Sequence, residues 1–207
     1  MKRNARPFLT VLLIFASVAF VRSQHLNKES YEIYDAVIRT MFADDKVTFD
    51  LGGPKVSQFV IRDHTLTGFS HGDKKESWDV IVKPRFKQLS DDVIEGYELN
   101  AKASVGLERK FGTNLPYKLI SEPELDAFFS EQNADWMDKK WKKFYEAYPG
   151  SHGYISFSNI GFNKAKDKAL VYFVHWCMAL CGTGHYILLS KNNGRWAVLE
   201  HSQIWIS

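Results

Sequence analysis

The chain has 207 residues, with 27 basic and 24 acidic side chains and a formal net charge of +3 at pH 7. Its composition, 45% hydrophobic and 14% aromatic, is typical of one globular domain that can bury its own core. The first 23 positions hold four of the basic residues and no acidic residue, so the rest of the chain is nearly neutral. Charge therefore gives no support to a nucleic-acid-binding protein.

Residues 1–23 have the pattern of a secretory signal peptide, with basic residues near the start and an uncharged apolar run from 8 to 21. This run of about 14 residues is shorter than the roughly 20 that a helix needs to span a bilayer. We expect cleavage before Gln24, which leaves residues 24–207 as a single domain exported to the periplasm or the medium. An uncleaved segment that anchors the chain is the alternative.

Apolar side chains at helical spacing predict a first helix over residues 28–42, with Asn27 as its N-cap. A short β-branched run at 56–62 predicts a strand. Asp63 and His64 follow this run. Because neighbouring strand residues point to opposite faces, we do not expect these two side chains to act together.

Residues 78–130 are predicted to be mainly helical, with interruptions. Ser90 fits the N-cap of a helix over 91–101. Ser121 and Glu124 fit a capping box that opens a shorter helix ending at residue 129. These signals place several short helices in the first two thirds of the chain.

Residues 135–148 carry the clearest amphipathic pattern, an aromatic stripe opposite four lysines. Such a helix can lie on an anionic membrane. The interpretation we favour is a helix that packs on the core and exposes its lysines to water.

From residue 153 onward the apolar period becomes that of strands. The continuously apolar run 169–176 predicts a central strand that is covered on both faces. Asn193 and Gly194 predict a tight hairpin, since a type I′ turn needs positive φ at both positions. The predicted fold is therefore α+β, with N-terminal helices packed on a C-terminal antiparallel β-meander. Its strands are expected at about 154–161, 168–177, 185–191 and 195–202.

Cys177 and Cys181 are the two cysteines of the chain, and Gly182 and Gly184 directly after them mark a turn. In an exported protein this spacing predicts a disulfide that fixes the shape of a loop. The closed loop is very short, so the chain-entropy model gives about 2 kcal/mol of stabilisation. A redox-active pair, a nucleophilic cysteine with a histidine partner, and two unreactive thiols are the other interpretations.

A metal site is a further alternative for the same segment. Zinc binds nitrogen and sulfur ligands tetrahedrally, and four such groups occur within eleven residues. On a strand, His175 and Cys177 would share one face. The candidate ligands are His175, Cys177, Cys181 and His185.

Short motifs from residue 160 to the end resemble a group of uncharacterised exported bacterial proteins. These motifs are Ile160-Gly-Phe-Asn163, Ala169-Leu-Val-Tyr172, Tyr186-Ile-Leu-Leu189, Asn193-Gly-Arg-Trp196 and Trp205-Ile-Ser207, together with the segment from Cys177 to Gly184. The resemblance implies bacterial export and carries no catalytic residue over. An N-terminal helix followed by a curved meander is also similar to the cone-shaped fold of nuclear-transport-factor-2-like proteins, in which a pocket serves catalysis or binding. This similarity concerns the fold and gives no function.

The chain has no G-x-S-x-G elbow, no H-E-x-x-H motif and no Walker loop. His185 is the histidine best suited to act as a general base, although a structural role is commoner for such a residue. We therefore expect an exported non-enzymatic protein that binds a small molecule or another envelope component. No cofactor or nucleic acid is expected, and membrane contact is expected only through an uncleaved signal segment. The alternative is a hydrolase or metal-dependent enzyme that uses the four residues of the candidate metal set.

Overall fold

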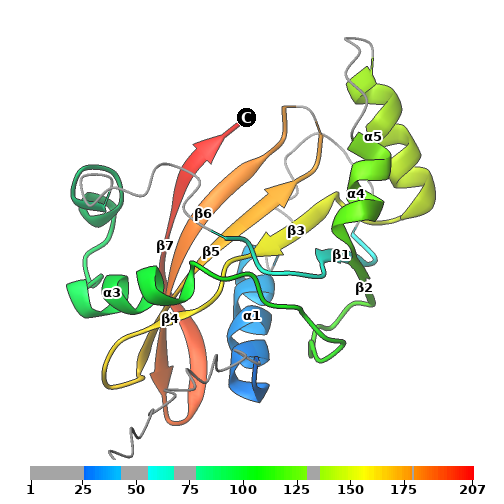
Figure 1. Ribbon diagram of the computed structural model, residues 1–207. Helices are drawn as coiled ribbons and strands as arrows, with labels where there is room; N and C mark the ends of the chain where they lie inside the picture. The colour runs from blue at the N-terminus through cyan, green and yellow to red at the C-terminus, as the bar shows by residue number, and fades with distance from the viewer. Residues whose placement is uncertain (1–25, 43–55, 68–77, 130–135, 179) are drawn as a thin grey trace, which may run out of the picture.

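The computed structural model describes residues 26–42, 56–67, 78–129, 136–178 and 180–207 (Figure 1). The predicted signal peptide lies outside the described residues. The helices and strands, in chain order, are α1 (Lys28–Met41), β1 (Phe59–Arg62), the π-helix η1 (Trp78–Val82), the 3-10 helix η2 (Lys83–Arg85), α3 (Asp91–Asn100), β2 (Tyr117–Ile120), α4 (Glu122–Phe129), α5 (Trp136–Ala147), β3 (Tyr154–Phe157), β4 (Gly161–Phe162), β5 (Lys168–Trp176), β6 (Thr183–Asn192) and β7 (Arg195–Ile206). None of these helices is both long enough and apolar enough to cross a membrane.

Within the described residues the strands form one mixed sheet in the order β2-β1-β3-β5-β6-β7, with β4 paired to β5. β1 runs parallel to β2 and to β3, whereas β3, β5, β6 and β7 pair antiparallel. The α+β class is therefore confirmed, but the sheet is not the simple antiparallel meander that we expected. The difference comes from β2, four residues inside a segment predicted to be mainly helical. The helices before and after β2 let the chain cross over and return in parallel.

The expected strand at 154–161 is divided into β3 and β4 by a buried asparagine. The Asn159 side-chain nitrogen donates to the carbonyl oxygens of Asn100, the last residue of α3, at 3.0 Å and of Ala103 at 2.8 Å. These bonds draw the chain toward α3 and away from the sheet. Toward the end of the chain, β6 begins two residues earlier than predicted, and β7 continues for four residues beyond its predicted end.

The central position of β5 is confirmed, because both of its faces are covered. Alternate side chains belong to two clusters on opposite sides of the sheet. On one side Ala169, Val171 and Phe173 pack in a cluster with α1. On the other side the cluster shared with α3 and η1 contains Leu170, Tyr172 and Val174. Because both faces of β5 are buried, apolar residues are favoured at every position, which explains why its sequence does not alternate polar and apolar residues.

Local signals at both ends of the chain are confirmed. The Asn27 Oδ1 atom accepts a hydrogen bond from the Ser30 backbone N–H at 3.0 Å and caps α1. In the β6–β7 hairpin, Asn193 has φ 49° and Gly194 has φ 78°, as the two-residue turn requires.

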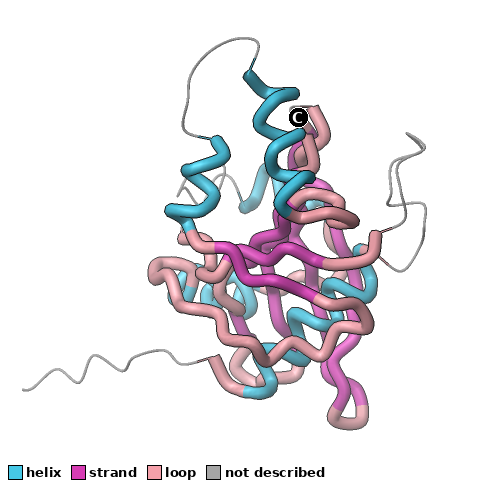
Figure 2. Tube along the Cα trace, turned by 90° about the vertical axis from the view of Figure 1, so that its right-hand side faces the viewer, coloured by secondary structure: helices cyan, strands magenta, loops and turns pink. Residues whose placement is uncertain are grey.

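Helices α4 and α5 stand together at one end of the molecule (Figures 1 and 2). A third apolar cluster there joins them to β1 and β2 through Val60, Ile120, Leu125, Trp141 and Phe144. The core-packing interpretation of α5 is thus confirmed. Its Lys140 is buried and donates from Nζ to the Phe129 carbonyl oxygen at 2.9 Å, while Lys139, Lys142 and Lys143 are exposed.

Candidate functional site at the disulfide end of the sheet

A disulfide joins Cys177 to Cys181, with the two Cα atoms 5.2 Å apart. Cys177 follows the last residue of β5 and Cys181 lies two residues before β6, so the bridge closes the connection between these strands. Both cysteines are buried, whereas Met178 is 48% exposed and Leu180 is 86% exposed. The predicted disulfide is present. The loop that it closes exposes two apolar side chains, Met178 and Leu180, to solvent.

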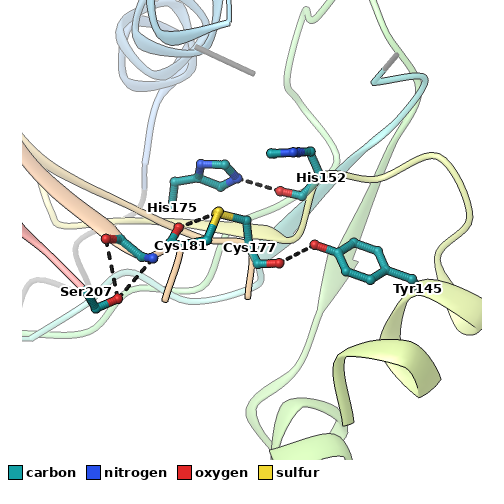
Figure 3. The surroundings of a disulfide bond; sticks show 7 residues. Tyr145, His152, His175, Cys177, Cys181 and Ser207 are labelled. Atoms are coloured by element: carbon teal, nitrogen blue, oxygen red, sulfur yellow. Dashed lines mark hydrogen bonds between the residues drawn. A yellow bond between two sulfur atoms is a disulfide. The ribbon is translucent and has the colours of Figure 1, made fainter. Parts of the chain in front are cut away.

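The base of this loop is fixed from two directions. The Tyr145 hydroxyl on α5 donates to the carbonyl oxygen of Cys177 (Figure 3). On the other side, the Ser207 N–H donates to the Gly182 carbonyl oxygen at 2.9 Å, and the Gly182 N–H donates to Ser207 Oγ at 3.0 Å. The loop is therefore attached both to α5 and to the end of β7.

A histidine pair lies directly beside the bridge. His175 Nε2 contacts the carbonyl oxygen of His152, and the two imidazole rings are 5.5 Å apart (Figure 3). A carbonyl oxygen only accepts, so Nε2 of His175 carries the proton in this contact and Nδ1 keeps its lone pair. One ligand atom from each of His152, His175 and Cys177 lies within 4.8 Å of the other two.

Sequence reasoning missed His152, which is 23 positions before His175 in the chain. β3 begins at Tyr154 and pairs antiparallel with the end of β5, matching Tyr154 to Trp176. Gly153 precedes this pair with φ +81°, in the left-handed region that favours glycine. The signal available in the sequence was this His-Gly step immediately before a strand.

His185 lies farther along the same face of the sheet and is not part of the group around Cys177. It is the register partner of Phe173 and therefore a diagonal neighbour of His175. Its ring is 6.2 Å from that of His201, and its side chain is 8% exposed. Among the described residues, no hydrogen-bond partner is found for its buried Nδ1 atom.

The structure therefore does not bring the four predicted metal ligands, His175, Cys177, Cys181 and His185, together in one group. Among the described residues the group that includes Cys177 contains His152 in place of His185. The disulfide also leaves neither cysteine with a thiolate to offer. A metal role for the predicted set stays a prediction.

Burial keeps the histidines at this end neutral. It lowers the pKa of His175 to about 4, an effect that the hydrogen bond to His152 partly opposes. Burial likewise lowers the pKa of His185 to about 4, with smaller contributions from the nearby His201 and His175. The pKa of His152 is lowered by burial as well. At neutral pH these imidazoles carry lone pairs that can accept a proton or bind a cation.

We expected the side chains of Asp63 and His64 to point apart, but in the structure they contact each other. The His64 Nδ1 and Asp63 Oδ1 atoms are 2.8 Å apart. Both residues lie beyond the end of β1, where the alternation of side chains along a strand no longer applies. The His64 side chain is 57% exposed, so we assign this pair to the surface.

No protein-family model, no curated protein and no solved structure matches this chain. The resemblances to exported bacterial proteins and to nuclear-transport-factor-2-like proteins consequently stay expectations, and no residue role is transferred from them.

Proposed function

We propose that this protein is exported and acts as a non-enzymatic, envelope-associated binding protein. The observation that carries the proposal is the disulfide-closed loop, which displays Met178 and Leu180 to solvent. A bridge between the cysteines is compatible with an oxidising compartment. It also removes the two thiols on which the alternative of a hydrolase or metal-dependent enzyme relied.

Exposed apolar groups at one place favour a contact surface. Ile206, which is 59% exposed, lies next to the loop through the hydrogen bond between Ser207 and Gly182. A short bridged loop loses little conformational freedom on binding, because its shape is already fixed. We call Met178, Leu180 and Ile206 the apolar tip.

The envelope component that fits this tip best is the surface of an anionic lipid bilayer, a contact beyond the uncleaved signal segment through which alone the sequence led us to expect membrane binding. Tyr145 links the loop to α5, and α5 and the loop lie toward the same end of the molecule (Figure 1). α5 exposes Lys139, Lys142 and Lys143 to solvent. Apolar side chains that enter the interface and lysines that contact anionic headgroups are the two contributions that bind peripheral proteins to membranes.

Vesicle cosedimentation tests the proposal, with phosphatidylcholine vesicles compared with mixed phosphatidylcholine and phosphatidylglycerol vesicles. We expect the oxidised protein to sediment with the anionic vesicles at low salt, and the double variant Met178→Ser, Leu180→Ser to lose most of this binding. Leu99→Ser is the matched control, because Leu99 is 71% exposed on α3. A protein that stays in the supernatant at low salt, or equal loss in both variants, would overturn the lipid contact.

Export is tested separately by the mass of the protein secreted from a bacterial host. The expected product begins at Gln24 and takes up a thiol-alkylating reagent only after reduction. Two thiols that react without reductant would contradict export to an oxidising compartment.

A further inference from the structure

We infer that reduction of the Cys177–Cys181 disulfide creates a binding site for a zinc-like divalent cation at the base of the loop that the disulfide closes. The ligands are His152, His175, Cys177 and Cys181. The inference goes beyond the proposed function, which uses the bridged form of the loop, and concerns the reduced form of the same residues.

Three of the four proposed ligand residues already lie close together in the oxidised protein, and the fourth, Cys181, is bonded to one of them. One ligand atom from each of His152, His175 and Cys177 lies within 4.8 Å of the other two. Ligand atoms around a tetrahedral zinc ion are about 3.5 Å apart, given zinc–ligand bonds of about 2.0 to 2.3 Å. The atoms therefore need to approach one another by roughly an ångström, and release of the bridge gives the Cys177 side chain that freedom.

The histidines are prepared for a cation by the fold. The contact of His175 Nε2 with the His152 carbonyl oxygen fixes the orientation of the ring, and the lone pair of Nδ1 stays free for a cation. Histidines that bind metals usually donate their other ring N–H to a carboxylate or backbone carbonyl in this way. His152 is half-buried and His175 is buried, so the site opens toward solvent on the His152 side.

The cysteines supply the remaining two ligands through a balanced exchange. A dithiol reductant transfers two electrons, its own sulfurs join into a disulfide, and the Cys177–Cys181 bond breaks to give two thiols. When the cation binds, the two thiols release two protons to water and their thiolates form two metal–sulfur bonds. Two thiolates and two neutral imidazoles compensate the charge of a divalent ion, and they form one of the usual ligand sets for zinc.

A cation bound in this way would close the same loop that the disulfide closes. The Tyr145 hydroxyl bond to the Cys177 carbonyl oxygen uses no atom of the ligand set, so it can persist in both forms. The loop thus has two alternative clamps, a sulfur–sulfur bond under oxidising conditions and a metal ion under reducing conditions.

Cobalt(II) titration of the purified protein tests this inference, since cobalt bound to thiolates absorbs in the near ultraviolet. The protein is titrated oxidised, and again after reduction with a phosphine that is then removed without air. We expect the reduced protein to bind one equivalent of cobalt with this absorption, and the oxidised protein to show none. Equal cobalt affinity in the two forms, or binding without the sulfur absorption, would overturn the inference.

His152→Ala is the decisive variant, because a half-buried side chain can be removed with little effect on folding. We expect it to weaken cobalt binding to the reduced protein at least about tenfold. His201→Ala is the matched control, an exposed histidine on the same face of the sheet, and should bind as the unmodified protein does. Unchanged affinity in His152→Ala would exclude the proposed ligand set. The vesicle assay uses the oxidised protein, so its result is independent of this one.

Discussion

The carbonyl oxygen of Trp176 occupies the space in which a side chain on Gly153 would stand. This close approach brings the beginning of β3 against the end of β5, and it sets the carbonyl oxygen of His152 against Nε2 of His175. The glycine is therefore required twice, once for its positive φ and once for the missing side chain.

We expect Gly153→Ala to lower the free energy of unfolding by at least about 2 kcal/mol, since the added methyl group overlaps backbone that cannot move independently. Urea denaturation measures the change. Gly194→Ala is the control, because Gly194 has a similar φ of +78° but no atom within 4 Å of the added carbon. It should lower stability by only about 1 kcal/mol, the cost of the left-handed backbone alone. Equal losses in the two variants would show that the contact with Trp176 has no effect.

Elements with strong local signals were predicted correctly from the sequence. The helix α1 has an N-cap and apolar side chains at helical spacing, and the β6–β7 hairpin has its Asn-Gly turn. The Cys177–Cys181 bridge joins two residues only four positions apart, and it was the interpretation favoured for this pair. In each case the contacts that decide the structure lie within a few positions in the chain.

What the sequence did not reveal depends on contacts between distant segments. β2 is four residues long, too short for a periodic pattern, and its strand conformation comes from pairing with β1 more than fifty residues earlier. The break between β3 and β4 comes from Asn159 binding the end of α3. The candidate site itself needed the pairing of β3 with β5, which alone brings His152 to His175.

The free energy of unfolding should fall as the pH decreases from about 6.5 to about 4. His175 and His185 each have a pKa of about 4 in the folded protein and near 6.5 when unfolded, so the unfolded chain binds more protons over this range. Each histidine contributes stability that is complete above pH 6.5 and decreases by about 1.4 kcal/mol per pH unit below it. Burial of Asp35 raises the pKa of its carboxyl and acts in the opposite direction at the acidic end.

Thermal unfolding at several pH values checks this expectation in His185→Gln, which removes one of the two groups. The variant should lose about half of the slope that His175 and His185 together produce. His64→Gln serves as the control, because His64 is an exposed histidine outside the cluster. A slope in His185→Gln equal to that of the unmodified protein would mean that His185 is not held neutral by burial.

Asn27→Ala should lower the free energy of unfolding by about 1 kcal/mol, because the Ser30 N–H in the first turn of α1 loses its side-chain acceptor. Ser90 occupies the corresponding position before α3, but its hydroxyl donates to Asp92 and caps no backbone N–H. We expect Ser90→Ala to cost less than half as much. Urea midpoints compare the two variants, and a larger effect at Ser90 would contradict this account of the two helix ends.

The disulfide contributes to stability mainly by restricting the unfolded chain. The closed loop is so short that the chain-entropy model gives about 2 kcal/mol for the bridge. We expect the double variant Cys177→Ser, Cys181→Ser to lose about this much in urea denaturation, and the unmodified protein to lose a similar amount when reductant is added. The double variant should then be insensitive to reductant. Because the hydrogen bonds of the Tyr145 hydroxyl to Cys177 and of Gly182 to Ser207 use no sulfur atom, they can hold the base of the loop, and the fold should survive without the bridge. A protein whose urea midpoint is unchanged by reductant would show that the bridge shapes the loop without stabilising the fold.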